Sequence, residues 1–337
     1  GIGFALLAVA AVLPARSLFG IEVTRQPIMP VSVGDTLLVE LAVENRTTQP
    51  KMLLQVQDLL PERLGQPVRD VVETIPARSH YRWTYQQVAQ RRGIYRWQIV
   101  QLRTATPFGL FWCRRDRPAP ATAVVYPGVL PLTYCPLIDQ MGQELRPQFQ
   151  SSSYRASATT EGLTRSLRPY RWGDPARLVH WRSSARAGEL RVRELEAITG
   201  GQEILISLDS ALSWHPDHFE QAVVAAASLY FYARRHKQTV ELWTAGAGLL
   251  RGHLTVLEAL AQVDAGEAIY HKPSQRPSIW LTGNSATLNH LPAGSRWILW
   301  PTAPQPGMRE NLLNLTHPGI VIQADQPLQL QLQSTLS

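Results

Sequence analysis

Apolar and polar residues alternate along the first third of the chain. Residues 33–47 place Leu37, Val39, Leu41 and Val43 on one face, which is the period of a half-buried strand. Similar stretches follow at 52–61, 80–89 and 94–104, separated by the turn-forming cluster 45–50 and by prolines and glycine. Short strands with turns at such intervals predict an antiparallel β-sandwich over residues 20–126. Such modules mediate interaction or spacing, and nothing in this one resembles a catalytic site.

The pattern changes after Gly201. Buried strands are predicted at 203–209, 239–245, 278–283, 296–301 and 321–324, with amphipathic helices at 217–237 and 255–263. Strands that alternate with helices favour a parallel sheet covered by helices. We therefore expect a three-layer α/β domain over residues 201–335.

Two further segments carry neither pattern. Residues 127–160 are rich in Pro, Gln and Ser and predict a linker or mobile loop. Residues 1–13 are an uninterrupted apolar run, shorter than the roughly 20 residues that span a bilayer. Since no basic residues precede the run and no small-residue cleavage site follows it, a signal peptide is not favoured. We interpret residues 1–15 as the end of a transmembrane helix; the alternative is a buried strand or helix of the sandwich.

Residues 161–200 are rich in Arg and Trp. Asp174 is placed to cap a helix that begins at Pro175, because its carboxylate can accept a backbone N–H of the first turn. Leu178, Trp181 and Ala185 then recur at helical spacing, and a short strand is expected around residues 190–193. The segment predicts a helix followed by a strand, with Trp181 buried.

This segment resembles the domain of unknown function 58 family of bacteria. The resemblance includes the stretches 91–95, 106–111 and 124–129, and in the segment itself it rests on Tyr170, Gly173, Asp174, Arg177, His180, Trp181, Ala185, Arg193, Glu194 and Glu196. It implies signature residues with a structural role. From the residues themselves, we expect Arg177, Arg182 and Arg186 to form ion pairs with Glu194 and Glu196 and not to bind a ligand.

The resemblance also implies an architecture and a cellular context. The C-terminal domain of the family is von Willebrand factor A-like, a Rossmann-type α/β fold. A hairpin of membrane helices precedes the soluble part, which then faces the cytoplasm. The family is encoded beside MoxR-type AAA+ ATPases, so such an ATPase is the expected partner at the cell membrane.

Charge and cysteine content agree with that context. The net charge is +7 and the isoelectric point is about 9.7, which favours an acidic partner or an anionic membrane surface. The basic residues form no motif that reads nucleic acid, so a nucleic-acid partner is not expected. Cys113 and Cys135 show no metal-ligand or disulfide spacing, and we expect two unpaired thiols in a reducing compartment.

A divalent-metal site is the first functional alternative. The A-like fold holds Mg²⁺ through an Asp-x-Ser-x-Ser loop, a threonine and a further aspartate, and oxygen donors of this kind suit a hard cation. Here Asp209, Ser213 and Thr282 fit the pattern, but Ala211 replaces a hydroxyl and the loop after Thr282 lacks the aspartate. We therefore predict a degenerate site that binds no metal, and no cofactor.

A hydrolase is the weaker alternative. Asp174, His180 and Ser183 or Ser184 lie close in sequence. Asp174 is occupied by capping, however, and neither a nucleophile elbow nor a phosphate-binding loop is present. The sequence predicts a non-enzymatic, membrane-anchored adaptor that binds other proteins in envelope or complex assembly.

Overall fold

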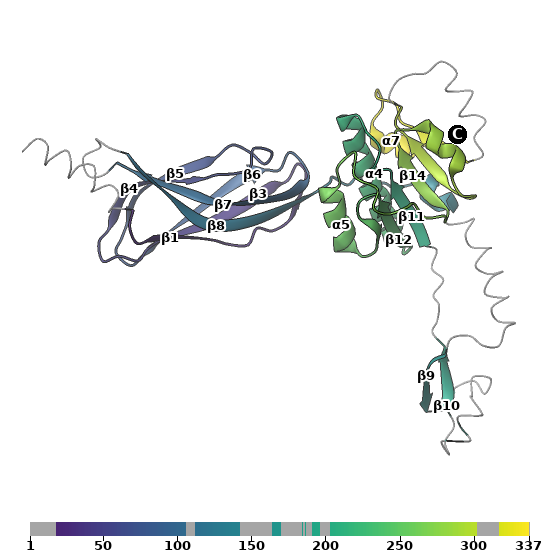
Figure 1. Cartoon of the computed structure of the whole chain (residues 1–337), viewed down its shortest axis with the longest axis horizontal. Helices are drawn as coiled ribbons and strands as arrows, with labels where there is room; N and C mark the ends of the chain where they lie inside the picture. The colour runs from purple at the N-terminus through teal and green to yellow at the C-terminus, as the bar shows by residue number, and fades with distance from the viewer. Residues whose placement is uncertain are drawn as a thin grey trace, which may run out of the picture. The chain divides into compact units, whose positions relative to one another are not determined.

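The computed structural model describes residues 18–105, 112–141, 164–169, 184, 186, 191–195, 203–301 and 317–336. They form a mixed, sheet-rich protein with four sheets (Figure 1). Two compact units are present. One contains the described residues up to Leu130 together with 210–228 and 244–272, and the other contains those of 131–209, 229–243 and 273–337.

Two sheets in the N-terminal part face each other. The first has the order β1-β3-β6 and the second the order β2-β8-β7-β4-β5. Their bounds are β1 Ile21–Arg25, β2 Val31–Ser32, β3 Thr36–Asn45, β4 Lys51–Asp58, β5 Val68–Ile75, β6 His80–Val88, β7 Gly93–Thr104 and β8 Cys113–Tyr126. The strands predicted from alternation are present. One pairing departs from the antiparallel prediction, since Val31 and Ser32 pair with β8 in parallel.

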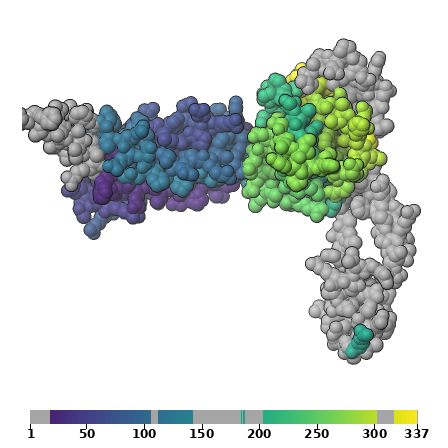
Figure 2. Space-filling view, viewed as in Figure 1, coloured from purple at the N-terminus to yellow at the C-terminus, as the bar shows by residue number. Residues whose placement is uncertain are grey.

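A single hydrophobic core lies between these two sheets. Leu37, Val39, Leu41 and Val43 of β3 are all at most 1% exposed, as the alternation predicts. They pack with residues such as Val56 of β4 and Val100 of β7 from the opposite sheet. The strands that enclose this core form the purple-to-blue part of the surface in Figure 2. Two sheets with a shared core have the arrangement of a β-sandwich.

A buried charge joins the two sheets inside this core. Asp58 of β4 is fully buried and forms an ion pair with Arg25 of β1, whose side chain is 1% exposed. The same carboxylate accepts hydrogen bonds from the Tyr85 hydroxyl at 2.7 Å and from Trp97 Nε1 at 2.9 Å. Burial, followed by the negative charge of Asp58, raises the pKa of the Tyr85 phenol. Every partner is needed, because an unpaired charge in a core is strongly destabilising.

The C-terminal part contains a six-stranded sheet of order β13-β12-β11-β14-β15-β16. Its bounds are β11 Glu203–Leu208, β12 Thr239–Thr244, β13 Gly248–Leu250, β14 Ser278–Thr282, β15 Arg296–Leu299 and β16 Gly319–Val321. The helices are α4 Pro216–Arg235, α5 His253–Gln262, the 3-10 helix η2 Ser285–His290 and α7 Leu328–Leu332. β11, β14, β15 and β16 pair in parallel, as predicted from the alternation of strands and helices.

Part of the expected linker is packed instead. Residues 136–141 are helical, and Leu137, Ile138 and Met141 are at most 1% exposed. Asp139 in this turn accepts a hydrogen bond from the Tyr232 hydroxyl at 3.0 Å. The apolar content of this short stretch outweighs its prolines, and the linker prediction is wrong for residues 132–141.

The remaining described segments are short. β9 (Thr164–Pro169) and β10 (Arg191–Leu195) pair as antiparallel strands. β10 overlaps the strand predicted near 190–193, whereas β9 has no counterpart in the prediction. No helix among the described residues combines the length and apolar character needed to cross a bilayer. The predicted end of a transmembrane helix at residues 1–15 lies outside those residues.

Candidate functional site

Asp209 and Thr282 meet at the carboxyl ends of adjacent parallel strands. β11 ends at Leu208, β14 ends at Thr282, and the two strands pair in register. The Thr282 hydroxyl donates a hydrogen bond of 2.8 Å to Asp209 Oδ2, and the Asp209 amide donates to the Leu281 carbonyl at 3.0 Å. The fold thus brings together two of the three residues of the predicted degenerate site.

The surroundings hold the Thr282 side chain in place. Thr282 is fully buried, and its oxygen accepts a hydrogen bond from the Asn284 amide at 3.1 Å. The Thr287 hydroxyl donates to the Asn284 carbonyl at 2.8 Å, which closes the turn. Burial raises the pKa of the Asp209 carboxyl, and the hydrogen bond from Thr282 opposes that rise. Hydrogen bonds therefore fix the Thr282 hydroxyl against the Asp209 carboxylate, which is partly desolvated.

The donor set does not suit a hard cation. Mg²⁺ needs an octahedral set of oxygens, and here the Thr282 oxygen already accepts a hydrogen bond from the Asn284 amide while its proton bonds to Asp209. Ser210 is engaged elsewhere, since its hydroxyl accepts from the Ala245 amide at 2.9 Å. Ser213 is exposed, and Ala211 offers no side-chain oxygen. Across the described part of the chain, no three His, Cys, Asp or Glu side chains gather closely enough to hold a metal ion.

Most of the predicted signature residues cannot be placed. Eight of them lie outside the described residues, namely Tyr170, Gly173, Asp174, Arg177, His180, Trp181, Ala185 and Glu196. Arg193 and Glu194 belong to β10, where they pair with Leu167 and Ser166 of β9. Ser184, a nucleophile of the hydrolase alternative, is 6% exposed.

An exposed apolar surface lies beside the edge strand β13. Leu249, Ile269 and Tyr270 are 45%, 67% and 77% exposed, and we call them the β13 surface. The chain segments that carry them are neighbours. The Tyr270 amide donates to the Ala245 carbonyl at 3.1 Å, and a Cβ on Gly248 would lie 2.8 Å from the His271 ring. Exposed aromatic and aliphatic side chains that gather in this way mark an interaction site.

Two basic residues, Arg251 and Lys272, are exposed next to the β13 surface in the sequence. The acids of the neighbouring loop are Asp264, which is exposed, and Glu267, which is half-buried and accepts a hydrogen bond from the Gly246 amide at 3.2 Å. The sequence pattern did not indicate this surface, because β13 has only three residues and the 263–273 loop has no periodicity.

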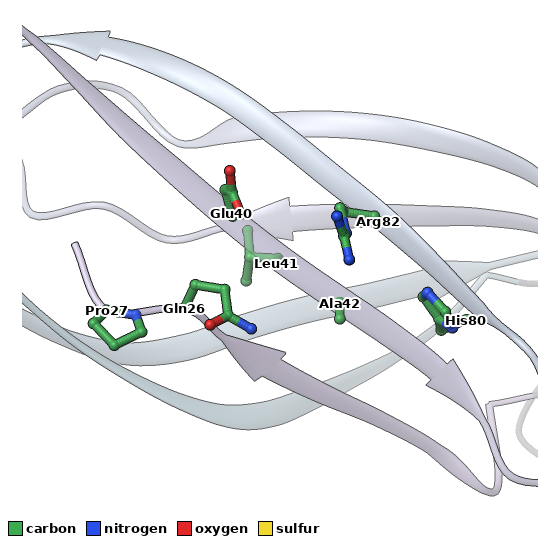
Figure 3. Close-up of a pocket in the computed structure, with 7 residues that line it drawn as sticks. All are labelled: Gln26, Pro27, Glu40, Leu41, Ala42, His80 and Arg82. Atoms are coloured by element: carbon green, nitrogen blue, oxygen red, sulfur yellow. The ribbon is translucent and has the colours of Figure 1, made fainter. Parts of the chain in front are cut away.

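A hollow of about 290 Å³ lies on the sandwich (Figure 3). Its polar lining includes Glu40 of β3 and His80 and Arg82 of β6, and Ala42 lies between them. Ala42 and Arg82 are direct cross-strand partners. The lining contains one carboxylate and no serine, threonine or cysteine.

The structure gives a role to Arg92, which the sequence marked only as part of a motif. Its guanidinium forms two hydrogen bonds with Glu220, at 2.9 and 3.0 Å, and donates to the Leu260 carbonyl at 2.7 Å. It also lies 5.6 Å from the centre of the Phe219 ring. All four residues belong to the same compact unit. Arg92 is therefore a structural cross-link that needs the planar guanidinium.

The chain therefore belongs to the mixed α and β class. It combines a sheet-rich N-terminal part with a second sheet that contains parallel strands. Residues 166–275 match the family described as "Protein of unknown function DUF58". Over these residues the chain is similar to DUF58 proteins, in agreement with the resemblance of its signature segment. A similar curated protein is the "Uncharacterized protein YeaD" of Bacillus subtilis, 25% identical over 203 residues. The match covers 58% of this chain and 48% of YeaD, about half of the relative's length.

Solved structures resemble the chain only locally. The match to the CARDB domain of PF1109 from Pyrococcus furiosus covers 32% of this chain and 94% of that domain, with 15% identity and a TM-score of 0.24. The PapD-like domain 7 of human CEP192 covers 32% and 84%, with 12% identity and a TM-score of 0.22. Similarity at this level has no bearing on function.

Proposed function

We propose that this protein is a membrane-anchored, non-enzymatic adaptor that binds other proteins on the cytoplasmic side of the cell membrane. The single observation that carries the proposal is the β13 surface, where Leu249, Ile269 and Tyr270 are exposed together beside a sheet edge. An exposed edge with apolar side chains suits an extended segment of another protein. The exposed cations beside it favour an acidic segment.

The partner we propose is a MoxR-type AAA+ ATPase, on the grounds of the family resemblance. In this account the six-stranded sheet and its helices are a von Willebrand factor A-like domain. The parallel strands β11, β14, β15 and β16 support that assignment, as does the position of Asp209 and Thr282 at their carboxyl ends. The domain then serves as a binding module whose cation site has been replaced by a hydrogen bond.

Partner capture tests the proposal. The tagged full chain is solubilised from membranes of the source organism, and bound proteins are identified by mass spectrometry. The expected result is a MoxR-type ATPase that is lost with Ile269→Ser and Tyr270→Ser. Leu330→Ser is the matched control, because Leu330 is 62% exposed on α7. Capture of the same ATPase by all variants, or no ATPase with the wild type, contradicts the proposal.

Protease protection in spheroplasts tests the orientation. If the soluble part faces the cytoplasm, external protease leaves it intact until the membrane is broken. Digestion of the domain in intact spheroplasts rules out both the topology and a cytosolic ATPase as partner.

The second candidate is a divalent-metal-dependent ligand-binding A-domain. The observation in its favour is that Asp209 and Thr282 do come together at the expected edge. The donor set argues against it, and metal titration decides between the two.

A further inference from the structure

Four large apolar side chains are exposed at one end of the sandwich. Phe19 is 72% exposed, Met52 57%, Leu53 58% and Trp112 71%, and we call this group the apolar end. They come from three places in the sequence: the turn before β1, the start of β4 and the residue before β8. Large exposed side chains from separate segments are unusual on one end of a small domain.

Hydrogen bonds and strand pairing connect these three segments. The Leu53 carbonyl accepts a hydrogen bond from the Thr104 hydroxyl at 3.2 Å, and Thr104 pairs with Cys113, the neighbour of Trp112. The Gly20 carbonyl, next to Phe19, accepts from the Arg46 amide at 2.9 Å. Residues 46–50 then lead directly into β4. The four side chains therefore belong to one end of the same sandwich.

The backbone at this end is strained where it presents Leu53. Among the described residues, three that are not glycine have positive φ, and two of them, Leu53 at 50° and Arg78 at 52°, lie here. Arg78 is held in place by a hydrogen bond from its amide to the Thr47 carbonyl at 3.0 Å. Left-handed backbone is unfavourable for a leucine, and strain of this kind accompanies function. The strain holds an apolar side chain in solvent, which gives no benefit to folding.

Three arginines are exposed at this end, namely Arg78, Arg114 and Arg115, and the exposed acids beside them are Glu73 of β5 and Asp116 of β8. Asp116 accepts a hydrogen bond from Gln101 at 3.2 Å. Glu22 and Glu44 are already paired with Arg46. Arginines beside Trp, Phe, Leu and Met form the combination found where proteins sit at the headgroup level of an anionic bilayer.

We infer that the apolar end inserts into the surface of an anionic lipid bilayer. The inference rests on the membrane attachment in the proposed function and specifies which face of the sandwich meets the lipid. Phe19 lies six positions after Leu13, the last residue of the apolar run. Six residues span at most about 22 Å. An anchored run therefore keeps Phe19 and its neighbours close to the lipid headgroups.

The test uses the full chain with a polarity-sensitive fluorophore at one cysteine. In a Cys113→Ser background, Leu53→Cys is labelled and the chain is reconstituted into vesicles of phosphatidylcholine and phosphatidylglycerol that contain doxyl-labelled lipid. Val88→Cys is the matched control, because Val88 is 49% exposed and pairs with Thr36 at the opposite end of β3. Unchanged melting temperatures show that both variants are folded.

The expected result is strong quenching and a blue shift at position 53, and neither at position 88. Omitting phosphatidylglycerol or substituting Arg114→Ser and Arg115→Ser should weaken the quenching at 53. Vesicle flotation is measured in parallel. A chain that floats without quenching at 53 overturns the inference and leaves membrane attachment intact, whereas a chain that does not float overturns both. Equal quenching at both positions also overturns it. So does a blue shift at position 53 that occurs without lipid because two copies of the chain associate.

Discussion

The hydroxyl of Thr282 bonds to the carboxylate of Asp209 across the carboxyl ends of β14 and β11, at 2.8 Å. Two groups that would bind a cation in a metal-dependent A-domain here bind each other. A hydrogen bond thus joins the carboxyl ends of these two strands, and the Asp209 carboxylate is partly desolvated.

Asp209→Asn should stabilise the protein at neutral pH. Burial raises the pKa of Asp209, so the folded state disfavours the ionised form. Its contribution to stability is full below the ordinary pKa of an aspartate, about 4, and is lost as pH rises through the folded pKa. As pH rises over that window, the free energy of unfolding of the asparagine variant should increase relative to that of the wild type. The difference should persist at higher pH. Chemical denaturation at a series of pH values measures this; a variant that is less stable at pH 7 contradicts the account.

Divalent metal should leave stability unchanged. A ligand that binds the native state at 100 times its dissociation constant adds about 2.7 kcal/mol. Thermal melts of the wild type and Asp209→Asn with millimolar Mg²⁺ or Mn²⁺ should therefore coincide with those in chelator. A wild-type shift that Asp209→Asn abolishes would establish the metal-dependent alternative.

Asp58→Ala should cost about 3–5 kcal/mol, because it leaves the Arg25 guanidinium buried without its counter-ion. The double variant Asp58→Ala and Arg25→Met should recover part of that loss, since no buried charge is then left alone. Urea denaturation of the two variants provides the comparison. If the single variant costs less than 1 kcal/mol, Asp58 and Arg25 are not the buried pair described here.

Leu53→Gly should stabilise the fold by about 0.5 kcal/mol. Left-handed backbone costs a leucine roughly 1–2 kcal/mol, and the extra freedom of glycine costs about 0.5–1 kcal/mol. Val88→Gly, also at an exposed strand position, should instead lose about 0.5–1 kcal/mol. Opposite signs in denaturant unfolding are the expected outcome. If both substitutions change stability in the same direction, the backbone at Leu53 is not strained and does not support the apolar end as a lipid-binding surface.

Local periodicity predicted much of this fold. The alternation in β3 identifies the buried face, and the long apolar stripe of α4 identifies a helix, because burial of one face imposes a period that the sequence must show. The meeting of Asp209 with Thr282 was implied by the resemblance to the A-like fold, in which the carboxyl ends of adjacent parallel strands lie at one edge. That Thr282 bonds to Asp209 instead of facing a cation depends on side-chain geometry that spacing does not determine.

Other features have no local signature. The two-residue strand β2 pairs with β8 across more than ninety residues, and residues 136–141 form too short a helix to show a period. The exposure of Ile269 and Tyr270 could not be predicted from the sequence either, because a loop has no periodicity that distinguishes a buried apolar residue from an exposed one. The surfaces proposed for partner and lipid therefore came from the structure alone.

Binding between this chain and the MoxR-type ATPase of the same organism tests the central claim most directly. The full chain in nanodiscs is titrated with the purified ATPase, for the wild type, for Ile269→Ser/Tyr270→Ser and for the control Leu330→Ser. The account predicts saturable binding that the double variant weakens at least tenfold, about 1.4 kcal/mol, and that the control retains. No binding by the wild type, or equal affinity for all three proteins, would contradict it.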